Sequence, residues 1–261
     1  MARPTIAFLT DFGTRDHYVG AMKGAALTIC PEATLVDITH DIDPQDILGG
    51  ALELAASYPY FPPRSVFVAV VDPGVGSARR ALAAEAGDYT FVAPDNGLLT
   101  LVLRDLAAPR VVELRDPQFA RATVSRTFEG RDRFAPAAAW LARGTPVASL
   151  GPGVESWEVL EIPRAEVSGN TLRGEVLRID RFGNLVTSID RDAFDGFAAP
   201  GAVVLVGPHR IRLVTTYADA ALHALCALFG SSNRLEIAVN GGSAARHLGV
   251  ARGAPVAVSR A

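Results

Sequence analysis

Apolar residues in the first 150 or so positions alternate between short continuous runs and helix-like spacings. Runs such as Thr5 to Thr10 and Val66 to Val71 are typical of strands buried on both faces. Between them, His17 to Ile29 repeats apolar residues at helical spacing, and Pro31 ends the pattern. Strands that alternate with helices predict an α/β domain with three layers and a largely parallel sheet. The remaining elements predicted here are strands over 35–38, 81–84 and 89–93, and helices over 46–57 and 131–143 with a short one ending at 103.

The pattern changes around Gly151-Pro152-Gly153. From Gly174 onward, short alternating segments separated by turn residues predict a small β-barrel or sandwich. We expect an α/β domain over 1–155, a β-barrel domain over 163–261 and a linker over 156–162. The predicted strands cover 175–180, 185–190, 202–206, 209–213, 234–239 and 255–259, and the apolar stretch 218–229 predicts one helix.

Composition excludes several classes of function. The 261 residues carry a net charge of -3, so no basic surface is expected to recruit nucleic acid or an anionic membrane. No run of about 18 apolar residues occurs, and Met1 to Pro4 leads straight into a strand instead of a signal peptide. We expect a cytoplasmic protein. Cys30 and Cys226 form no CxxC pair, which favours free core cysteines over a disulfide or a thiolate metal site.

Candidate chemistry begins where a buried strand ends. Asp72 follows the apolar run, and Pro73, Gly74 and Gly76 then force a tight turn before Arg79. Open α/β sheets place their ligands at the carboxyl ends of strands. The alternative is a turn aspartate with surface arginines. Similar polar, glycine-bearing clusters occur at Thr10 to Asp16, Thr127 to Asp132, Asp180 to Asn184 and Ser231 to Ala238.

The histidines do not indicate a metal site. His40 follows a strand, His17 begins a helix, and His209, His223 and His247 are at no ligand spacing. Zinc sites need paired cysteines or closely spaced histidines, which this chain does not have. We therefore expect no metal, and we expect His40 to have a structural role.

Further motifs are spread over nearly the whole chain. They are Thr10 to Gly13, Tyr18 to Gly24, Val36 to His40, Val71 to Gly76, Pro94 to Gly97, Gly130 to Pro136, Phe182 to Asn184 and Leu235 to Ala238. Taken together and in this order, these segments resemble the S-adenosyl-L-methionine (SAM) hydrolases that form adenosine, a family related to the fluorinase and chlorinase.

The resemblance implies an N-terminal α/β domain and a C-terminal β-barrel. It also implies a homotrimer in which SAM lies between the N-terminal domain of one subunit and the C-terminal domain of the next. The implied reaction is attack of water on ribose C5′, which releases adenosine and L-methionine. Because the leaving group is a neutral thioether, the enzyme must fix the ribose, anchor methionine and align a water, and no cofactor is implied.

The family's substrate contacts carry over to this chain as expectations. Asp11 matches the carboxylate that binds the ribose diol, since an ionised carboxylate can accept from both hydroxyls. Asp16 and Asp180 match contacts to the methionine amino group, and Ser231 or Ser232 matches the contact to its carboxylate. The residues that match the adenine site are Phe182 and Asn184, with Glu236 and Ala238 in the same wall.

Asp72 and Arg79 match two members of the family's water-handling triad. The third is usually a histidine, and this chain has Glu129 in its place. Histidine titrates near neutrality, whereas an ordinary glutamate is ionised there. Our hypothesis is that Glu129 replaces histidine as a water-orienting acceptor. The alternative is that Glu129 pairs with Arg131 or Arg79 and shapes the loop.

Two other functions stay open at this stage. A SAM-dependent halogenase would use the same pocket, but a glutamate there would repel a halide. A non-catalytic module that binds adenosine or SAM is supported by the missing histidine. It predicts tight binding without turnover, which separates it from the enzyme.

Overall fold

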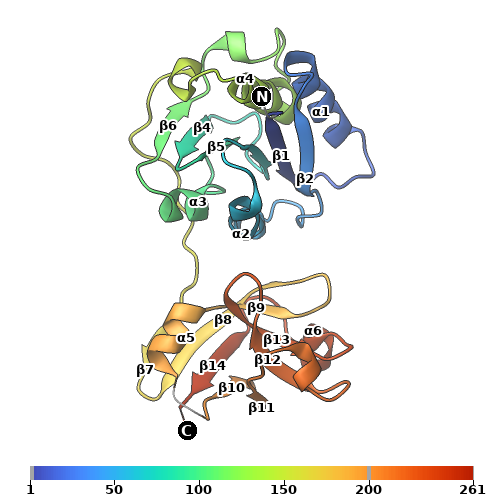
Figure 1. Cartoon of the computed structure of the whole chain (residues 1–261), viewed down its shortest axis with the longest axis vertical. Helices are drawn as coiled ribbons and strands as arrows, with labels where there is room; N and C mark the ends of the chain where they lie inside the picture. Colours follow the sequence, from blue (N-terminus) through green and yellow to red (C-terminus); the bar gives the residue numbers. More distant parts are fainter. Residues whose placement is uncertain (1–2, 199–200, 261) are drawn as a thin grey trace. The chain divides into compact units, whose positions relative to one another are not determined.

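The computed structural model describes residues 3–198 and 201–260 of the chain. These residues form two compact units, Met1–Leu160 and Glu161–Ala261 (Figure 1). Each has its own hydrophobic core.

The N-terminal unit is built on a mixed sheet with the strand order β2-β1-β3-β5-β4-β6. The neighbouring strands β2, β1, β3 and β5 run parallel, and β4 is antiparallel to both β5 and β6. The apolar runs of β1 and β3 are almost entirely buried, as parallel strands covered on both faces require. The strands are β1 Thr5–Thr10, β2 Thr34–Thr39, β3 Val66–Val70, β4 Ala81–Ala86, β5 Tyr89–Pro94 and β6 Arg110–Glu113.

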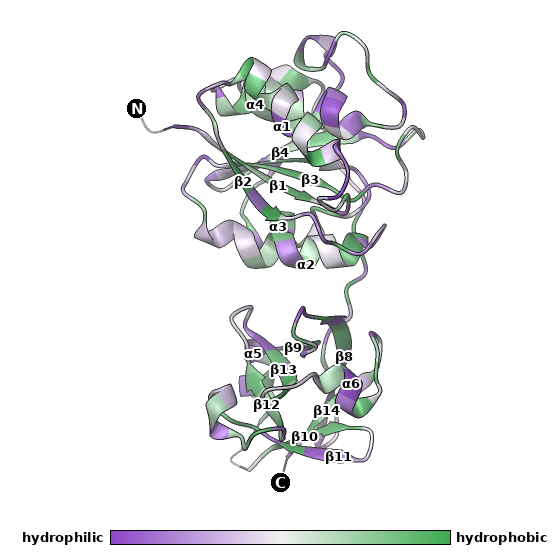
Figure 2. Ribbon diagram, turned by 90° about the vertical axis from the view of Figure 1, so that its right-hand side faces the viewer, coloured by the Kyte–Doolittle hydropathy of each residue, from purple (hydrophilic) through white to green (hydrophobic). Residues whose placement is uncertain are grey.

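Helices cover both faces of this sheet. Figure 2 shows α1 and α4 on one face and α2 and α3 on the other. A π-helix, η3 (Gly130–Phe134), leads directly into α4, and π-helical turns occur frequently at functional sites. The helices are α1 Tyr18–Ile29, α2 Ile47–Ser57, α3 Thr100–Asp105 and α4 Ala135–Ala142, with the short 3-10 turns η1 Tyr58–Tyr60, η2 Pro117–Phe119 and η4 Val147–Leu150.

The C-terminal unit is an antiparallel sheet in the order β11-β10-β14-β8-β9-β13-β12, with β7 added on β8. A bridge between Leu213 and Ala227 brings the two ends of this order together, so the sheet is nearly closed into a barrel. Its elements are β7 Glu166–Ser168, β8 Thr171–Ile179, β9 Leu185–Asp190, α5 Arg191–Phe197, β10 Val203–Val206, β11 His209–Arg212, η5 Tyr217–Asp219, β12 Leu225–Phe229, β13 Arg234–Val239, α6 Ala244–Leu248 and β14 Pro255–Ser259.

The helix predicted over 218–229 is wrong. Residues 225–229 form β12, which pairs antiparallel with β13, and His223 has a positive φ of 63° that a helix does not contain. Alanine and leucine favour helix locally, but β13 offers a buried partner strand, and burial outweighs the small difference in propensity.

Within the described ranges, no helix has the length and apolar character needed to cross a bilayer. Cys30 and Cys226 are buried and free, as expected.

Candidate active site

Asp11 and Asp72 lie at the same edge of the N-terminal sheet. β1 and β3 are parallel neighbours, and their register pairs Thr10 with Val70. Asp11 follows directly on β1, and Asp72 comes two residues after β3, so the parallel pairing brings both carboxylates to the carboxyl end of the sheet. The fold therefore juxtaposes two residues that are 61 positions apart in the sequence.

A tight turn carries the chain from Asp72 to Arg79. Gly76 has a φ of 78°, and a Cβ there would lie 2.4 Å from the carbonyl oxygen of Arg126. Both the positive φ and the lack of space for a Cβ require glycine at position 76. This close contact packs the turn against the segment that leads to Glu129.

Arg79 joins two carboxylates. Its Nε donates to Asp72 Oδ1 at 2.9 Å, and its Nη2 donates both to Asp72 Oδ2 and, at 2.5 Å, to Glu129 Oε2. We call Asp72, Arg79 and Glu129 the carboxylate–arginine cluster. The structure thus brings together the three predicted catalytic residues. The interpretation of Asp72 as a turn aspartate with surface arginines does not fit Arg79, which is only 11% exposed.

The cluster is shielded from solvent. The Asp72 side chain is 4% exposed and that of Glu129 13%. Phe134, which is fully buried, lies under the guanidinium, with the Arg79 Cζ 5.4 Å from the ring centroid. Burial alone would lower the pKa of Arg79, but the hydrogen bonds and charges of Asp72 and Glu129 raise it above its usual value. Arg79 is therefore a permanent cation shared by two carboxylates.

Glu129 has a second arginine neighbour. Arg133 Nη2 lies 3.6 Å from Glu129 Oε1, one helical turn along the chain. Arg131 instead pairs with Asp132, at 2.6 and 2.7 Å. Of the two ion pairs considered from the sequence, Glu129 therefore makes the one with Arg79.

Asp132 supports the segment that carries Glu129. Its side chain is completely buried and accepts from the Ser125 N–H at 2.9 Å as well as from Arg131. Burial would raise the pKa of Asp132, but the hydrogen bonds from Arg131 and Ser125 lower it. Asp132 stays ionised and holds the loop before Glu129 in place. In the sequence, Asp132 stands out only as part of a motif.

A chain of hydrogen bonds lies beneath the Asp11 turn. Lys23 donates to Asp37 at 2.6 Å, Asp37 binds His40 Nε2 at 2.9 Å, and His40 Nδ1 contacts the Thr10 hydroxyl at 2.8 Å. Asp37 can only accept, so Nε2 carries a hydrogen and, in the neutral ring, Nδ1 accepts from Thr10. The Thr10 oxygen then accepts from the Phe12 N–H at 3.2 Å. His40 has the structural role expected, as a support for this turn.

One oxygen of the Asp11 carboxylate already accepts a hydrogen bond. Its Oδ2 accepts from the Gln45 N–H at 2.8 Å, which leaves Oδ1 and further lone pairs for a ligand. Asp16 is exposed in the loop before α1.

Three aromatic rings connect the Asp11 turn to the Glu129 segment. Phe12 lies 5.9 Å from Tyr18 and 6.1 Å from Phe128, and Tyr18 lies 5.2 Å from Phe128, all edge to face. Because Phe12 follows Asp11 and Phe128 precedes Glu129, this contact holds the two segments side by side. Sequence analysis did not single out Tyr18 for this role, and its helical position gave no signal of it.

Asp95 and Asn96 form hydrogen bonds at the same carboxyl edge of the sheet. Asn96 Nδ2 donates to the Val71 carbonyl at 2.8 Å, directly before Asp72. Asp95 accepts from Arg80 at 2.7 Å and from the Glu158 N–H at 2.8 Å. The contacts of these two side chains are structural.

In the C-terminal unit, Asp180 organises an exposed loop. Its carboxylate accepts from the backbone N–H groups of Phe182 and Asn184 at 2.9 and 2.8 Å, and from Asn184 Nδ2 at 2.9 Å. This arrangement leaves the Phe182 ring 76% exposed at the tip, while Asn184 is buried. β9 follows, and its pairing of Leu185 with Ile237 places Asn184 beside Ala238.

Glu236 is a buried carboxylate on β13. Tyr217 donates to its Oε2 at 3.1 Å, and a Cβ on Gly230 would overlap its Oε1. Burial, and secondarily the charge of Asp180, raises the pKa of Glu236 despite the Tyr217 hydrogen bond. Burial and the adjacent Glu236 raise the pKa of Tyr217 to about 12. No pattern in the sequence pointed to Tyr217.

Ser231 and Ser232 lie in the turn before β13, at the opposite end of that strand from Ala238. Ser231 is exposed. The Ser232 hydroxyl is buried and has no hydrogen-bond partner among the described residues. The predicted site residues thus form two groups, one in each unit.

Within the described residues, no three His, Cys, Asp or Glu side chains are grouped so as to hold a metal ion.

An α/β unit with a buried carboxylate–arginine cluster at its strand ends is followed by a barrel with an exposed aromatic loop, which defines a two-domain protein with candidate site residues in each unit. The family model described as SAM hydroxide adenosyltransferase N-terminal domain matches residues 6–151, and the C-terminal domain model matches residues 174–257. The chain belongs to the SAM hydroxide adenosyltransferase family, which confirms the resemblance seen in the sequence.

Relatives match over nearly the full length. The (R)-S-adenosyl-L-methionine hydrolase of Thermus thermophilus is 42% identical, covering 96% of this chain and 98% of the relative. The hydrolase of Salinispora tropica is 41% identical, covering 96% and 95%. A fluorinase of Actinopolyspora mzabensis is 32% identical over 84% of each chain. A crystal structure of a conserved protein from Thermotoga maritima has a TM-score of 0.92 and 36% identity, covering 98% of this chain and 100% of that one.

Proposed function

We propose that this enzyme hydrolyses SAM to adenosine and L-methionine. The observation that carries the proposal is the carboxylate–arginine cluster, in a chain 42% identical to a protein named (R)-S-adenosyl-L-methionine hydrolase. A halide nucleophile is disfavoured, because Glu129 would repel an anion at the cluster.

The reaction is an in-line displacement at ribose C5′. A water oxygen forms a bond to C5′ as the C5′–S bond breaks, and the electron pair stays on sulfur, which leaves as the neutral thioether of methionine. The water loses one proton, so SAM and water give adenosine, methionine and a proton. No step needs a cofactor or a metal. The protein supplies alignment, a proton acceptor and a site poor in water.

Glu129 is better suited than Asp72 to hold the water. Both oxygens of Asp72 are bound to Arg79, whereas the described residues give Glu129 Oε1 only the 3.6 Å contact with Arg133. An oxygen with free lone pairs can accept a hydrogen bond from the attacking water. Arg79 and Asp72 then act as positioning residues that fix the carboxylate of Glu129.

The remaining roles follow from chemistry and position. Asp11 Oδ1 is available to the ribose hydroxyls, and Asp16 to the methionine ammonium. The exposed Phe182 ring offers a stacking face for adenine, with Asn184, Glu236 and Ala238 in the adjoining wall and Asp180 ordering the loop. Ser231, which is exposed, or Ser232 is assigned to the methionine carboxylate by its position in the family motif.

We further propose a homotrimer in which the N-terminal group of one subunit and the C-terminal group of the next complete each site. This arrangement is what the family resemblance implies, and it requires the predicted contacts to be divided between the two units, as they are.

The test of the reaction uses SAM in chloride-free buffer made with H₂¹⁸O. Adenosine and methionine are quantified by chromatography, and mass spectrometry locates ¹⁸O in the adenosine 5′-hydroxyl. Glu129→Gln should lower kcat at least tenfold, because an amide cannot take the proton. Glu113→Gln, which removes a carboxylate paired with exposed Arg115, is the matched control and should retain activity. Binding of SAM without product would instead assign a binding module.

Shared sites are tested by co-expressing Glu129→Gln with Phe182→Ala. If subunits share sites and mix at random, about one quarter of the sites have both wild-type halves, so activity returns to roughly that level. If each subunit completed its own site, the mixture would have no more activity than the two variants alone. Light scattering that gave a stable monomer would also contradict the trimer.

A further inference from the structure

A row of hydrogen bonds connects the surface of the N-terminal unit with the turn that carries Asp11. It begins at the ion pair of Lys23 and Asp37, whose side chains are 28% and 42% exposed. It continues inward through His40 and ends at Thr10, and both of these residues are buried. We call Asp37, His40 and Thr10 the His40 row.

The ionised end of the row determines the direction of every hydrogen bond in it. Burial would raise the pKa of Asp37, but the hydrogen bonds and charges of Lys23 and His40 lower it, so this carboxylate only accepts. His40 Nε2 therefore donates to Asp37 at 2.9 Å, and in the neutral ring Nδ1 accepts from the Thr10 hydroxyl at 2.8 Å. Because its hydrogen is used in this way, Thr10 Oγ1 is an acceptor for the Phe12 N–H, at 3.2 Å.

These bonds hold the backbone on both sides of Asp11. The bond from the Phe12 N–H to Thr10 Oγ1 spans Asp11, since the two residues are its neighbours in the chain. The His40 carbonyl oxygen accepts from the Gly13 N–H at 2.7 Å, which ties the far end of the turn to the same histidine. Asp11 Oδ2 itself accepts a backbone N–H at 2.8 Å. The direction of the free Oδ1 is therefore set by the turn and its supports.

We propose that the His40 row positions Asp11 for a vicinal diol, so that Thr10 and His40 determine the preference of the site for ribonucleosides over nucleosides without the diol. This inference rests on the proposed contact between Asp11 and the ribose. A carboxylate accepts from two adjacent hydroxyls only when its free lone pairs face both of them. Thr10 and His40 are buried, so they act through Asp11 as positioning residues.

The test compares adenosine with 2′,3′-dideoxyadenosine, whose binding to the full chain is measured by calorimetry. The two nucleosides differ only in the hydroxyls assigned to Asp11. A site built to bind hydroxyls rejects the analogue that lacks them, so the wild type should bind adenosine at least about tenfold more tightly. Thr10→Val removes the hydroxyl and should weaken adenosine at least about fivefold, with dideoxyadenosine unchanged within about twofold. Thr10→Ser keeps the hydroxyl and should retain the preference.

A second variant perturbs the row from its exposed end and leaves the buried residues in place. The amide in Asp37→Asn can donate as well as accept, so it no longer dictates which His40 nitrogen carries the hydrogen. We expect the preference for adenosine to fall by about threefold or more. If Thr10→Val does not fold, this variant decides the question.

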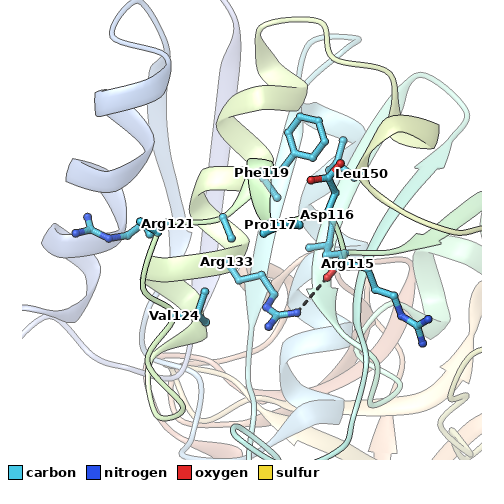
Figure 3. A pocket seen from close by; sticks show the side chains of 12 residues that line it. Arg115, Asp116, Pro117, Phe119, Arg121, Val124, Arg133 and Leu150 are labelled. Atoms are coloured by element: carbon cyan, nitrogen blue, oxygen red, sulfur yellow. Dashed lines mark hydrogen bonds between the residues drawn. The ribbon is translucent and has the colours of Figure 1, made fainter.

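Leu150→Val is the control for a general loss of packing in the same unit. Leu150 is fully buried and lines a cavity of about 160 Å³ together with Phe119, Val124 and Arg133 (Figure 3). No residue of the His40 row lines that cavity. Leu150→Val should therefore lower the free energy of unfolding and leave the ratio of the two affinities unchanged.

Equal weakening of both nucleosides by Thr10→Val would show that the row supports only the fold, and it would overturn the proposal. A ratio that stays unchanged in both Thr10→Val and Asp37→Asn would do the same, as would a wild-type chain that binds the two nucleosides equally. If the preference is present and is lost as expected, but SAM gives no adenosine, the proposed hydrolysis fails while the positioning role stands.

Discussion

Replacing Arg79 by methionine should expose the repulsion that this residue now neutralises. Methionine keeps much of the length and apolar surface of arginine and packs on the Phe134 ring, so the main loss is the charge. Asp72 and Glu129 would then be two buried carboxylates without their shared cation.

The size of the effect follows from the geometry. Asp72 Oδ2 and Glu129 Oε2 contact the same nitrogen, so the two oxygens are at most about 5 Å apart. At an effective dielectric constant of about 20, two charges at this separation repel by about 3 kcal/mol. Breaking a buried pair by removing one partner typically costs about 3–5 kcal/mol. We expect Arg79→Met to lower the free energy of unfolding at pH 7 by that amount.

The assay is urea denaturation followed by tryptophan fluorescence. Both tryptophans, Trp140 and Trp157, belong to the N-terminal unit, so their emission reports the unit that holds the cluster. Arg115→Met, at a mostly exposed ion pair, is the control and should cost less than about 1 kcal/mol.

A double variant isolates the repulsion. In the wild type, Glu129→Gln removes a favourable contact with Arg79 and should be destabilising. In the Arg79→Met background, the same substitution removes the repulsion from Asp72 and should recover about 2–3 kcal/mol. If Glu129→Gln has the same sign in both backgrounds, the two carboxylates are not coupled through Arg79 and the reasoning is refuted.

Three further outcomes are expected. Burial raises the pKa of Glu236, so the folded state binds its proton more tightly than the unfolded state, and this residue's contribution to stability decreases as the pH rises above the unfolded value. Glu236→Gln, which still accepts from Tyr217, should flatten that decrease in denaturation curves between pH 4 and pH 8, and an unchanged slope would contradict it. Burial raises the pKa of the Cys30 thiol to about 11, so only about 0.1% is thiolate at pH 8. Iodoacetamide should alkylate it far more slowly in the native protein than in urea, and equal rates would show that the thiol is accessible. Asp95→Ala removes the acceptor of Arg80 Nε and of the Glu158 N–H, while Arg80 Nη2 keeps its bond to the Ser156 carbonyl, and it should lower the free energy of unfolding by about 2–3 kcal/mol. A loss under about 0.5 kcal/mol in a urea titration would mean that these bonds add little.

The sequence predicted much of the secondary structure because hydrophobic spacing is a local property. Runs buried on both faces marked β1 and β3, helical spacing marked α1, and alternation marked most strands of the C-terminal unit. The prediction failed at 225–229, where local preference for helix was outweighed by pairing with β13. It missed β6, β7, α5 and α6, which are short and have few apolar residues in a clear pattern.

For the candidate site, the sequence predicted Asp72, Arg79 and Glu129, since turn chemistry and motif order are properties of the chain itself. Only the tertiary structure shows that Arg79 Nη2 donates to both carboxylates, because Glu129 lies 50 residues beyond Arg79 in the sequence. The Tyr217 contact with Glu236 also depends on distant segments that pack together. Hydrogen-bond partners, burial and cavities are set by which surfaces meet in the folded chain, and no local pattern records them.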